Sequence, residues 1–173
     1  MFVFGHLGFG SVLARPWRDR AGRWALLAGM LLPDVIDKPL YYARLSEFFS
    51  CTRTVGHTGL LVLVVLLTGV MSRRQVLVAL AIGMATHLIL DCVMDVIVGG
   101  SESSAMRAAV WPLMGTPFAR VYMSSVSVHI EHLVNLPIFV TEAVGAVLLV
   151  WELRRRAKLL HAQQSQAAGG DQQ

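Results

Sequence analysis

The chain carries six side chains of the types that ligate metal ions: His6, Asp34, Asp37, His57, His87 and Asp91. Neutral imidazole and carboxylate together suit zinc, manganese or iron better than calcium. Bridging carboxylates can hold two such ions about 3.5–4 Å apart, the arrangement that hydrolyses phosphate esters. These residue types indicate a divalent metal site, with zinc as the first choice and manganese or iron as alternatives.

His87 and Asp91 are the most informative pair because they are four residues apart in an apolar stretch. On a helix this spacing stacks both side chains on one face, where they can hold one metal ion or one proton path between them. Asp95 lies one further turn along, tilted off that face. A simpler interpretation is that neutral His87 and Asp91 satisfy each other and that Asp95 lies in the membrane interface.

The other candidates also have simpler interpretations when each is taken alone. His6 could be an interfacial histidine, Asp34 could cap a turn, and His57 could start its helix. Asp37 could form an ion pair with Lys38 or Arg44. The metal hypothesis therefore depends on all of these residues meeting at one place.

Two later groups contain similar chemistry. His129-Ile130-Glu131-His132 holds metal-ligand types, but it matches neither HExxH nor HxxEH, so it is at most an additional ligand set. Ser124, Ser125 and Ser127 lie near His129, but no GxSxG motif surrounds them. The sequence does not favour a serine hydrolase.

The composition places these residues in a membrane. Of 173 residues, 55% are hydrophobic and only 15% are charged. Gln75–Gly99 is long and apolar enough to cross a bilayer, and each ionisable group at the centre of such a helix costs roughly 2.5–3.5 kcal/mol, so these groups usually mark a site. The two cysteines predict neither a disulfide nor a Cys-rich zinc site. Nucleic acid is not an expected partner, because the basic clusters are short and flank apolar segments.

We therefore predict an all-α integral membrane helical bundle of about four apolar segments, with the first, Met1–Ala14, short or re-entrant. We expect Pro33 to break the next segment, which starts at Trp24, and Gly99–Ser127 to be a loop folded over one face. Residues 1–160 form a single membrane-embedded domain in this interpretation. Residues 161–173 form a disordered tail.

Basic residues predict the orientation. Ten of the fifteen Lys and Arg residues lie in three segments, Arg15–Arg23, Arg73–Arg74 and Arg154–Lys158. Alternation of the apolar segments puts all three on one side, which the positive-inside rule assigns to the cytoplasm. The candidate ligands then lie toward the other side. We expect a multi-pass protein of the inner or plasma membrane with a cytoplasmic C-terminus and membrane lipid as its surroundings.

Five short motifs carry a resemblance to a known family: GHLGFG at 5–10, LLPDVIDKP at 31–39, Arg53 followed by GHT at 56–58, THLILD at 86–91 and WPL at 111–113. Over roughly residues 1–115 the chain resembles the membrane-bound metal-dependent hydrolases, also described as LexA-binding, inner-membrane-associated hydrolases. The resemblance implies an all-helical membrane protein in which His and Asp from several helices hold metal. It matches all six candidate ligands to family positions.

The chain departs from the family pattern at two positions. Thr52 stands where the family commonly has a histidine before the arginine, and Asp34 and Asp37 are three residues apart where the common spacing is two. These departures leave open a reduced, mononuclear site.

The expected function is hydrolysis of a phosphoester by a metal site on the non-cytoplasmic side. Arg53, four residues before His57, is the candidate catalytic residue for phosphate charge. The alternative is a non-enzymatic membrane protein that uses the same residues for structural metal binding or for proton and ion handling. The sequence makes no prediction about the oligomeric state or a LexA connection.

Overall fold

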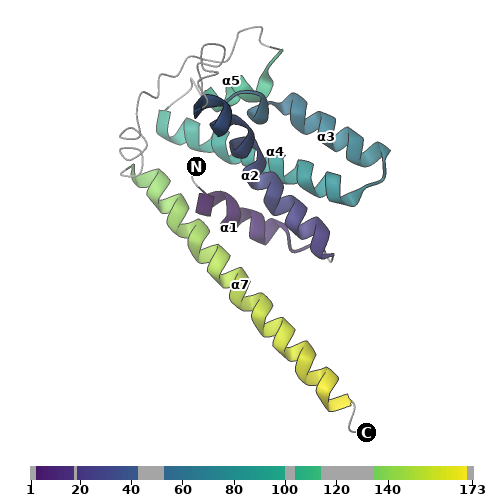
Figure 1. Cartoon of the computed structure of the whole chain (residues 1–173). Helices are drawn as coiled ribbons and strands as arrows, with labels where there is room; N and C mark the ends of the chain where they lie inside the picture. The colour runs from purple at the N-terminus through teal and green to yellow at the C-terminus, as the bar shows by residue number, and fades with distance from the viewer. Residues whose placement is uncertain (1–2, 18, 43–52, 100–103, 114–134, 171–173) are drawn as a thin grey trace.

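A computed structural model describes residues 3–17, 19–42, 53–99, 104–113 and 135–170, and every regular element in these ranges is a helix (Figure 1). The elements are α1 (Val3–Leu13), α2 (Arg20–Tyr42), the 3₁₀ turn η2 (Val55–His57), α3 (Gly59–Met71), α4 (Gln75–Gly99), α5 (Ser104–Val110) and α7 (Leu136–Gly170). The all-α prediction is confirmed for the described residues.

Helix α4 is the centre of the bundle, and it packs against α2, α3 and α5. Its bounds, Gln75–Gly99, are those that the apolar run predicts. The tight turn Ser72–Arg74 connects α3 to α4, and Arg73 adopts a positive φ of 54° there. Thr58 caps α3 by accepting a hydrogen bond from the N–H of Leu61, so His57 lies in η2 just before the helix.

Glycine lets two helix pairs approach closely. A Cβ added to Gly29 of α2 would collide with the carbonyl oxygen of Leu80, and one added to Gly83 of α4 would collide with that of Leu26. Gly8 of α1 and Gly145 of α7 meet in the same way. Small residues at such crossings are typical of membrane helices, which associate by close packing rather than by the hydrophobic effect.

Helix α2 corrects the prediction that Pro33 ends its segment, since the helix continues through both Pro33 and Pro39. A proline removes one backbone donor and crowds the preceding turn, but neighbouring helices can compensate for both effects. Here the close contact of α2 with α4 around Gly29 fixes the turn before Pro33.

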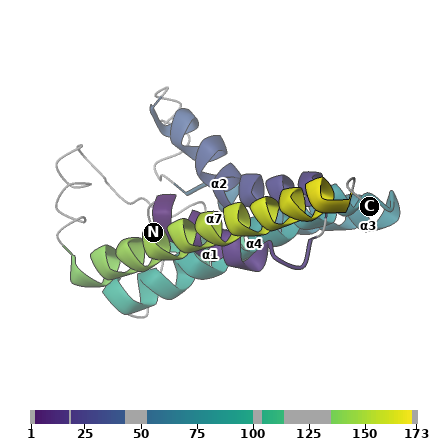
Figure 2. The ribbon, with the colours of Figure 1, turned by 90° about the horizontal axis from the view of Figure 1, so that it is seen from below.

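Helix α7 runs beside α1 in the same direction (Figures 1 and 2), and its C-terminal part projects beyond the other helices in Figure 1. With 35 residues it is about 50 Å long at 1.5 Å per residue. It continues to Gly170, so residues 161–170 are helical rather than part of the disordered tail that composition predicts. Residues 104–110 likewise form α5 within the expected loop. Residues 114–127 of that loop lie outside the described residues.

The bundle buries several polar side chains and exposes many large apolar ones. His6, Asp37, His57, His87 and Asp91 are all buried. Large apolar side chains are exposed along α3, α4 and α7, including Val64, Ile89, Val93, Val147 and Trp151. Buried charged groups and large exposed apolar surfaces are both rare in a water-soluble protein.

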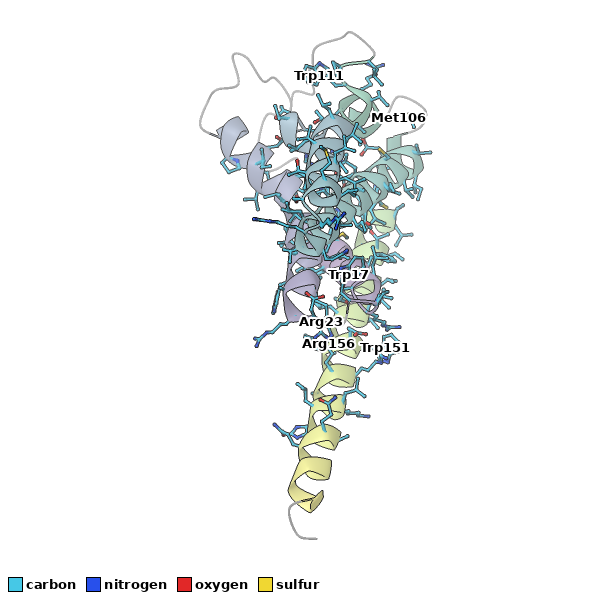
Figure 3. The ribbon with its side chains drawn as sticks, turned by 90° about the vertical axis from the view of Figure 1, so that its right-hand side faces the viewer. Trp17, Arg23, Met106, Trp111, Trp151 and Arg156 are labelled. Carbon is cyan, nitrogen blue, oxygen red and sulfur yellow. The ribbon has the colours of Figure 1, made fainter. Side chains whose placement is uncertain are left out.

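Two of the described helices, α4 and α7, are long and apolar enough to cross a membrane, and α1 and α3 are shorter apolar helices. Only 39% of the most apolar part of α4 and 11% of that of α7 are buried, whereas the core helix of a soluble protein is mostly buried. In Figure 3 the labelled Trp17, Arg23, Trp151 and Arg156 all lie below the labelled Met106 and Trp111. Arg15 and Arg156 both pair with Glu152, and Arg15 lies over the ring of Trp151. Trp and Arg gathered in this way are typical of a membrane–water interface.

Candidate metal centre

Five of the predicted ligands converge where α1, α2, η2 and α4 meet: His6, Asp34, His57, His87 and Asp91. Two overlapping sets, His6–His87–Asp91 and Asp34–His57–His87, each have their ligand atoms within 4.8 Å of one another. The three histidines and Asp91 are at most 4% exposed, whereas the side chain of Asp34 is 21% exposed. Asp34 is therefore the most accessible member of the centre.

Asp37, predicted as a ligand, binds protein donors with both carboxylate oxygens. It accepts hydrogen bonds from the N–H and the hydroxyl of Thr54, at 2.6 and 2.7 Å, and from the N–H of Gly56 at 2.8 Å. Nδ1 of His57 lies 2.7 Å from it. The hydrogen bonds from these neighbours thus hold both oxygens of the Asp37 carboxylate in place.

The contact with Asp37 determines the tautomer of His57. An ionised carboxylate only accepts hydrogen bonds, so Nδ1 of His57 carries the proton and donates it. In the neutral ring, Nε2 then presents a lone pair to the centre. A carboxylate that fixes a histidine in this way is the common support of a metal-ligating imidazole. Asp37 therefore contacts the Nδ1 side of His57, whereas the Nε2 side of the ring faces the centre.

His87 is fixed by a backbone carbonyl instead. Its Nδ1 lies 2.6 Å from the carbonyl oxygen of Met30, which can only accept, so Nδ1 donates and Nε2 is again a lone pair. Met30 lies three residues before Pro33 in α2, in the turn that the proline ring crowds. The proline-containing turn therefore orients His87 as well as carrying Asp34.

The two Nε2 atoms lie 3.2 Å apart, and with both rings neutral two lone pairs face each other. Nε2 of His57 is also 3.6 Å from Oδ1 of Asp34 and 3.7 Å from Oδ2 of Asp91. Nε2 of His87 is 3.8 Å from Oδ2 of Asp91. Ligand bonds of about 2.0–2.1 Å in tetrahedral geometry separate neighbouring ligands by about 3.3 Å. The residues present fit a divalent ion.

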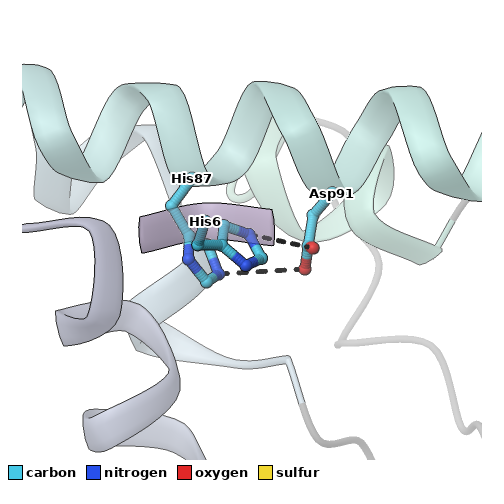
Figure 4. A group of neighbouring side chains, drawn as sticks. All are labelled: His6, His87 and Asp91. Atoms are coloured by element: carbon cyan, nitrogen blue, oxygen red, sulfur yellow. Dashed lines mark ion pairs between the residues drawn. The ribbon is translucent and has the colours of Figure 1, made fainter. Parts of the chain in front are cut away.

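His6 completes the centre from α1 (Figure 4). Its ring stacks on that of His87 with the centroids 4.0 Å apart, and its Nε2 lies 3.5 Å from Oδ1 of Asp91. Asp91 therefore has histidine nitrogens near both oxygens. His87 and Asp91 lie on one face of α4, as predicted, and His6 lies against that face.

Two cations flank the centre. Arg53 places Nη2 3.1 Å from Asp91 and Nη1 2.6 Å from Asp95. Asp95 also accepts a hydrogen bond from the N–H of Ala105 at the start of α5. Lys38 lies 2.7 Å from Asp34 rather than beside Asp37, and Arg44, the other partner suggested for Asp37, lies outside the described residues. Asp95 thus holds Arg53 at the centre.

Sequence reasoning missed the supporting groups, namely Thr54, the carbonyl of Met30 and the pairing of Asp95 with Arg53. Residue types cannot reveal a contact with a backbone carbonyl. The position of Asp95, one helical turn beyond Asp91, was a usable signal that it supports the centre. Thr52, His129–His132 and Ser124–Ser127 lie outside the described residues.

No protein-family model, curated protein or solved structure matches this chain. The resemblance to membrane-bound metal-dependent hydrolases therefore remains an expectation, and the function is argued from the centre itself.

Proposed function

We propose that this chain is a multi-pass membrane protein whose His/Asp centre binds a divalent metal ion, zinc first among the candidates, and hydrolyses a phosphoester in or near the membrane. The observation that carries the proposal is the 3.2 Å approach of two histidine Nε2 atoms, each with its Nδ1 proton committed elsewhere. Two facing lone pairs repel each other unless a proton or a metal ion lies between them. A metal ion relieves that repulsion and binds the nearby carboxylates as well, which a proton between the two nitrogens does not.

In this proposal the protein groups divide into three tasks. His57, His87 and Asp91 hold the ion, with His6 and Asp34 completing the shell, and Asp37 and the Met30 carbonyl orient the two rings. A bound divalent ion lowers the pKa of a water ligand and polarises a phosphoryl oxygen. Arg53, held by Asp95 and Asp91, presents a planar cation for substrate phosphate.

The membrane orientation is part of the same proposal. Alternation of the apolar segments along the chain puts the basic segments Arg15–Arg23, Arg73–Arg74 and Arg154–Lys158 at one end of the bundle and the His/Asp centre toward the other. By the positive-inside rule the basic end is cytoplasmic, which makes the C-terminus cytoplasmic and opens the centre to the opposite side.

One observation favours a second candidate, a closed structural metal site. Five ligand-type side chains surround the centre, and four of them are at most 4% exposed. A structural site is closed by its protein ligands, whereas a catalytic site keeps an open coordination position. Substrate would have to reach the centre beside Asp34, its one partly exposed member.

Turnover separates the two candidates. Purified protein in detergent, loaded with zinc or manganese, is assayed on phosphomonoesters, phosphodiesters and phospholipids across a pH series. The proposal expects a rate that rises with pH to a plateau, because the bound water must lose a proton, and that disappears on chelation. A metal-replete protein with no turnover on any of these substrates favours the structural site.

A further inference from the structure

Helix α7 contributes no ligand to the metal centre and lies outside the stretch, residues 1–115, that carries the family resemblance. It nevertheless touches the one helix that brings His6. Glu142 of α7 accepts hydrogen bonds from the backbone N–H groups of Phe4, at 3.0 Å, and Gly5, at 3.1 Å, one with each carboxylate oxygen. These are the two residues immediately before His6.

The first N–H groups of a helix have no partner within it and attract negative charge. Val3 begins α1, so the donors that Glu142 engages belong to its first turn. A carboxylate that accepts from two successive N–H groups fixes both the position and the rotation of that turn. Fixing that turn also fixes the direction in which the His6 side chain projects from α1.

The rest of the α1–α7 contact holds the part of α1 that follows His6. Gly8 and Gly145 bring the two backbones together without room for a side chain on either. Ten residues beyond Gly5, Arg15 forms an ion pair with the buried Glu152 at 2.9 Å and lies over the ring of Trp151. Helix α7 is the main neighbour of α1, so α7 sets where α1 lies against α4.

We infer that Glu142 is a positioning residue of the metal centre that acts through His6. This inference rests on the proposed metal site and extends it to a helix that carries no ligand. Residues that support a metal ligand typically contribute 10–100-fold to metal affinity.

Zinc affinity, measured by competition with a chromophoric chelator in detergent, tests the inference. Glu142→Gln keeps the side-chain volume but leaves one oxygen acceptor, so zinc should bind about tenfold more weakly, and Glu142→Ala should weaken it further. Glu152→Gln is the matched control, because it loosens the same helix pair at the far end. It should bind zinc within twofold of wild type.

The decisive comparison is in the His6→Ala background. If Glu142 acts through His6, Glu142→Gln should cause no additional loss of affinity once His6 is absent. The visible absorption of bound Co²⁺ should also change in the same way for Glu142→Ala and His6→Ala, because both remove the same ligand. Equal losses in both backgrounds, or an equal loss for Glu152→Gln, would overturn the inference.

The failure of this inference is distinguishable from failure of the metal site. If His6→Ala, His57→Ala and His87→Ala all bind zinc as tightly as wild type, the site itself is wrong. If those variants lose zinc while Glu142→Gln and Glu142→Ala do not, only the assignment of Glu142 is wrong.

Discussion

Nε2 of His57 and Nε2 of His87 face each other across 3.2 Å, and each ring is held from behind by a different acceptor. A carboxylate fixes His57 and a backbone carbonyl fixes His87. Because both supports accept the Nδ1 proton, both inner nitrogens are free to ligate. The orientation of both rings therefore depends on residues that would not touch a bound ion.

Asp37→Asn should weaken metal binding about 10–100-fold although Asp37 is not at the centre. The amide has one acceptor oxygen in place of two, so it can no longer serve Thr54, Gly56 and His57 together, and the Nε2–H tautomer of His57 becomes accessible. Zinc affinity of the purified variant measures the effect. Asp19→Asn, whose carboxylate bonds the N–H of Gly22, is the matched control. Unchanged affinity for Asp37→Asn would mean that the tautomer of His57 does not matter.

Arg53→Ala should retain bound metal but lose turnover, because its guanidinium is held beside the ligands rather than among them. Arg53→Lys should recover part of the activity, since a lysine supplies charge but not two parallel donors. Metal content and rate are measured on the same samples. Arg23→Ala, near the start of α2, is the control. If metal and rate fall together, Arg53 serves only to hold Asp91.

Gly29→Ala should destabilise the bundle by about 1–3 kcal/mol, because the added Cβ collides with backbone rather than with a movable side chain. Ala28→Leu adds more volume on the exposed side of the same turn and should be nearly neutral. Unfolding midpoints in mixed micelles compare the two variants. Equal stability of Gly29→Ala and wild type would contradict the close α2–α4 crossing.

Reporter fusions test the orientation. A reporter inserted after Arg74, or fused to the C-terminus, should report the cytoplasm, because the basic residues gather at those positions. A reporter within Ser101–Ser104 should report the opposite side. If the Arg74 and Ser101–Ser104 fusions report the same side, α4 does not cross the membrane.

The sequence predicts helix α4 well, because a long uninterrupted apolar run that follows a tight turn forms a single helix. Helix geometry then places His87 and Asp91, four residues apart, on the same face. The sequence predicts α2 poorly. Pro33 is a strong local signal for a helix end, and only the packing of α2 against α4 overrides it. The Gln- and Ala-rich end of α7 is a similar case, since these residues are good helix formers and extend a helix that is already nucleated.

The task of Asp37 could not be read from residue types. A ligating carboxylate and one that orients a ligand have the same chemistry, and the choice between them depends on the donors of Thr54 and Gly56. Those donors come from a turn that starts seventeen residues later in the chain. By contrast, the sequence could predict that the histidines meet Asp91. Alternation of the apolar segments puts the ends that carry these residues toward the same side of the predicted membrane bundle.

The metal content of the purified protein tests the central claim most directly. After expression in zinc-supplemented medium and dialysis, wild type should retain stoichiometric metal by elemental analysis, whereas His57→Ala, His87→Ala and Asp91→Ala should each retain far less. His161→Ala, on the exposed far part of α7, should match wild type. If all five proteins hold the same amount of metal, or none, the facing nitrogens of His57 and His87 share no metal ion and the account is wrong.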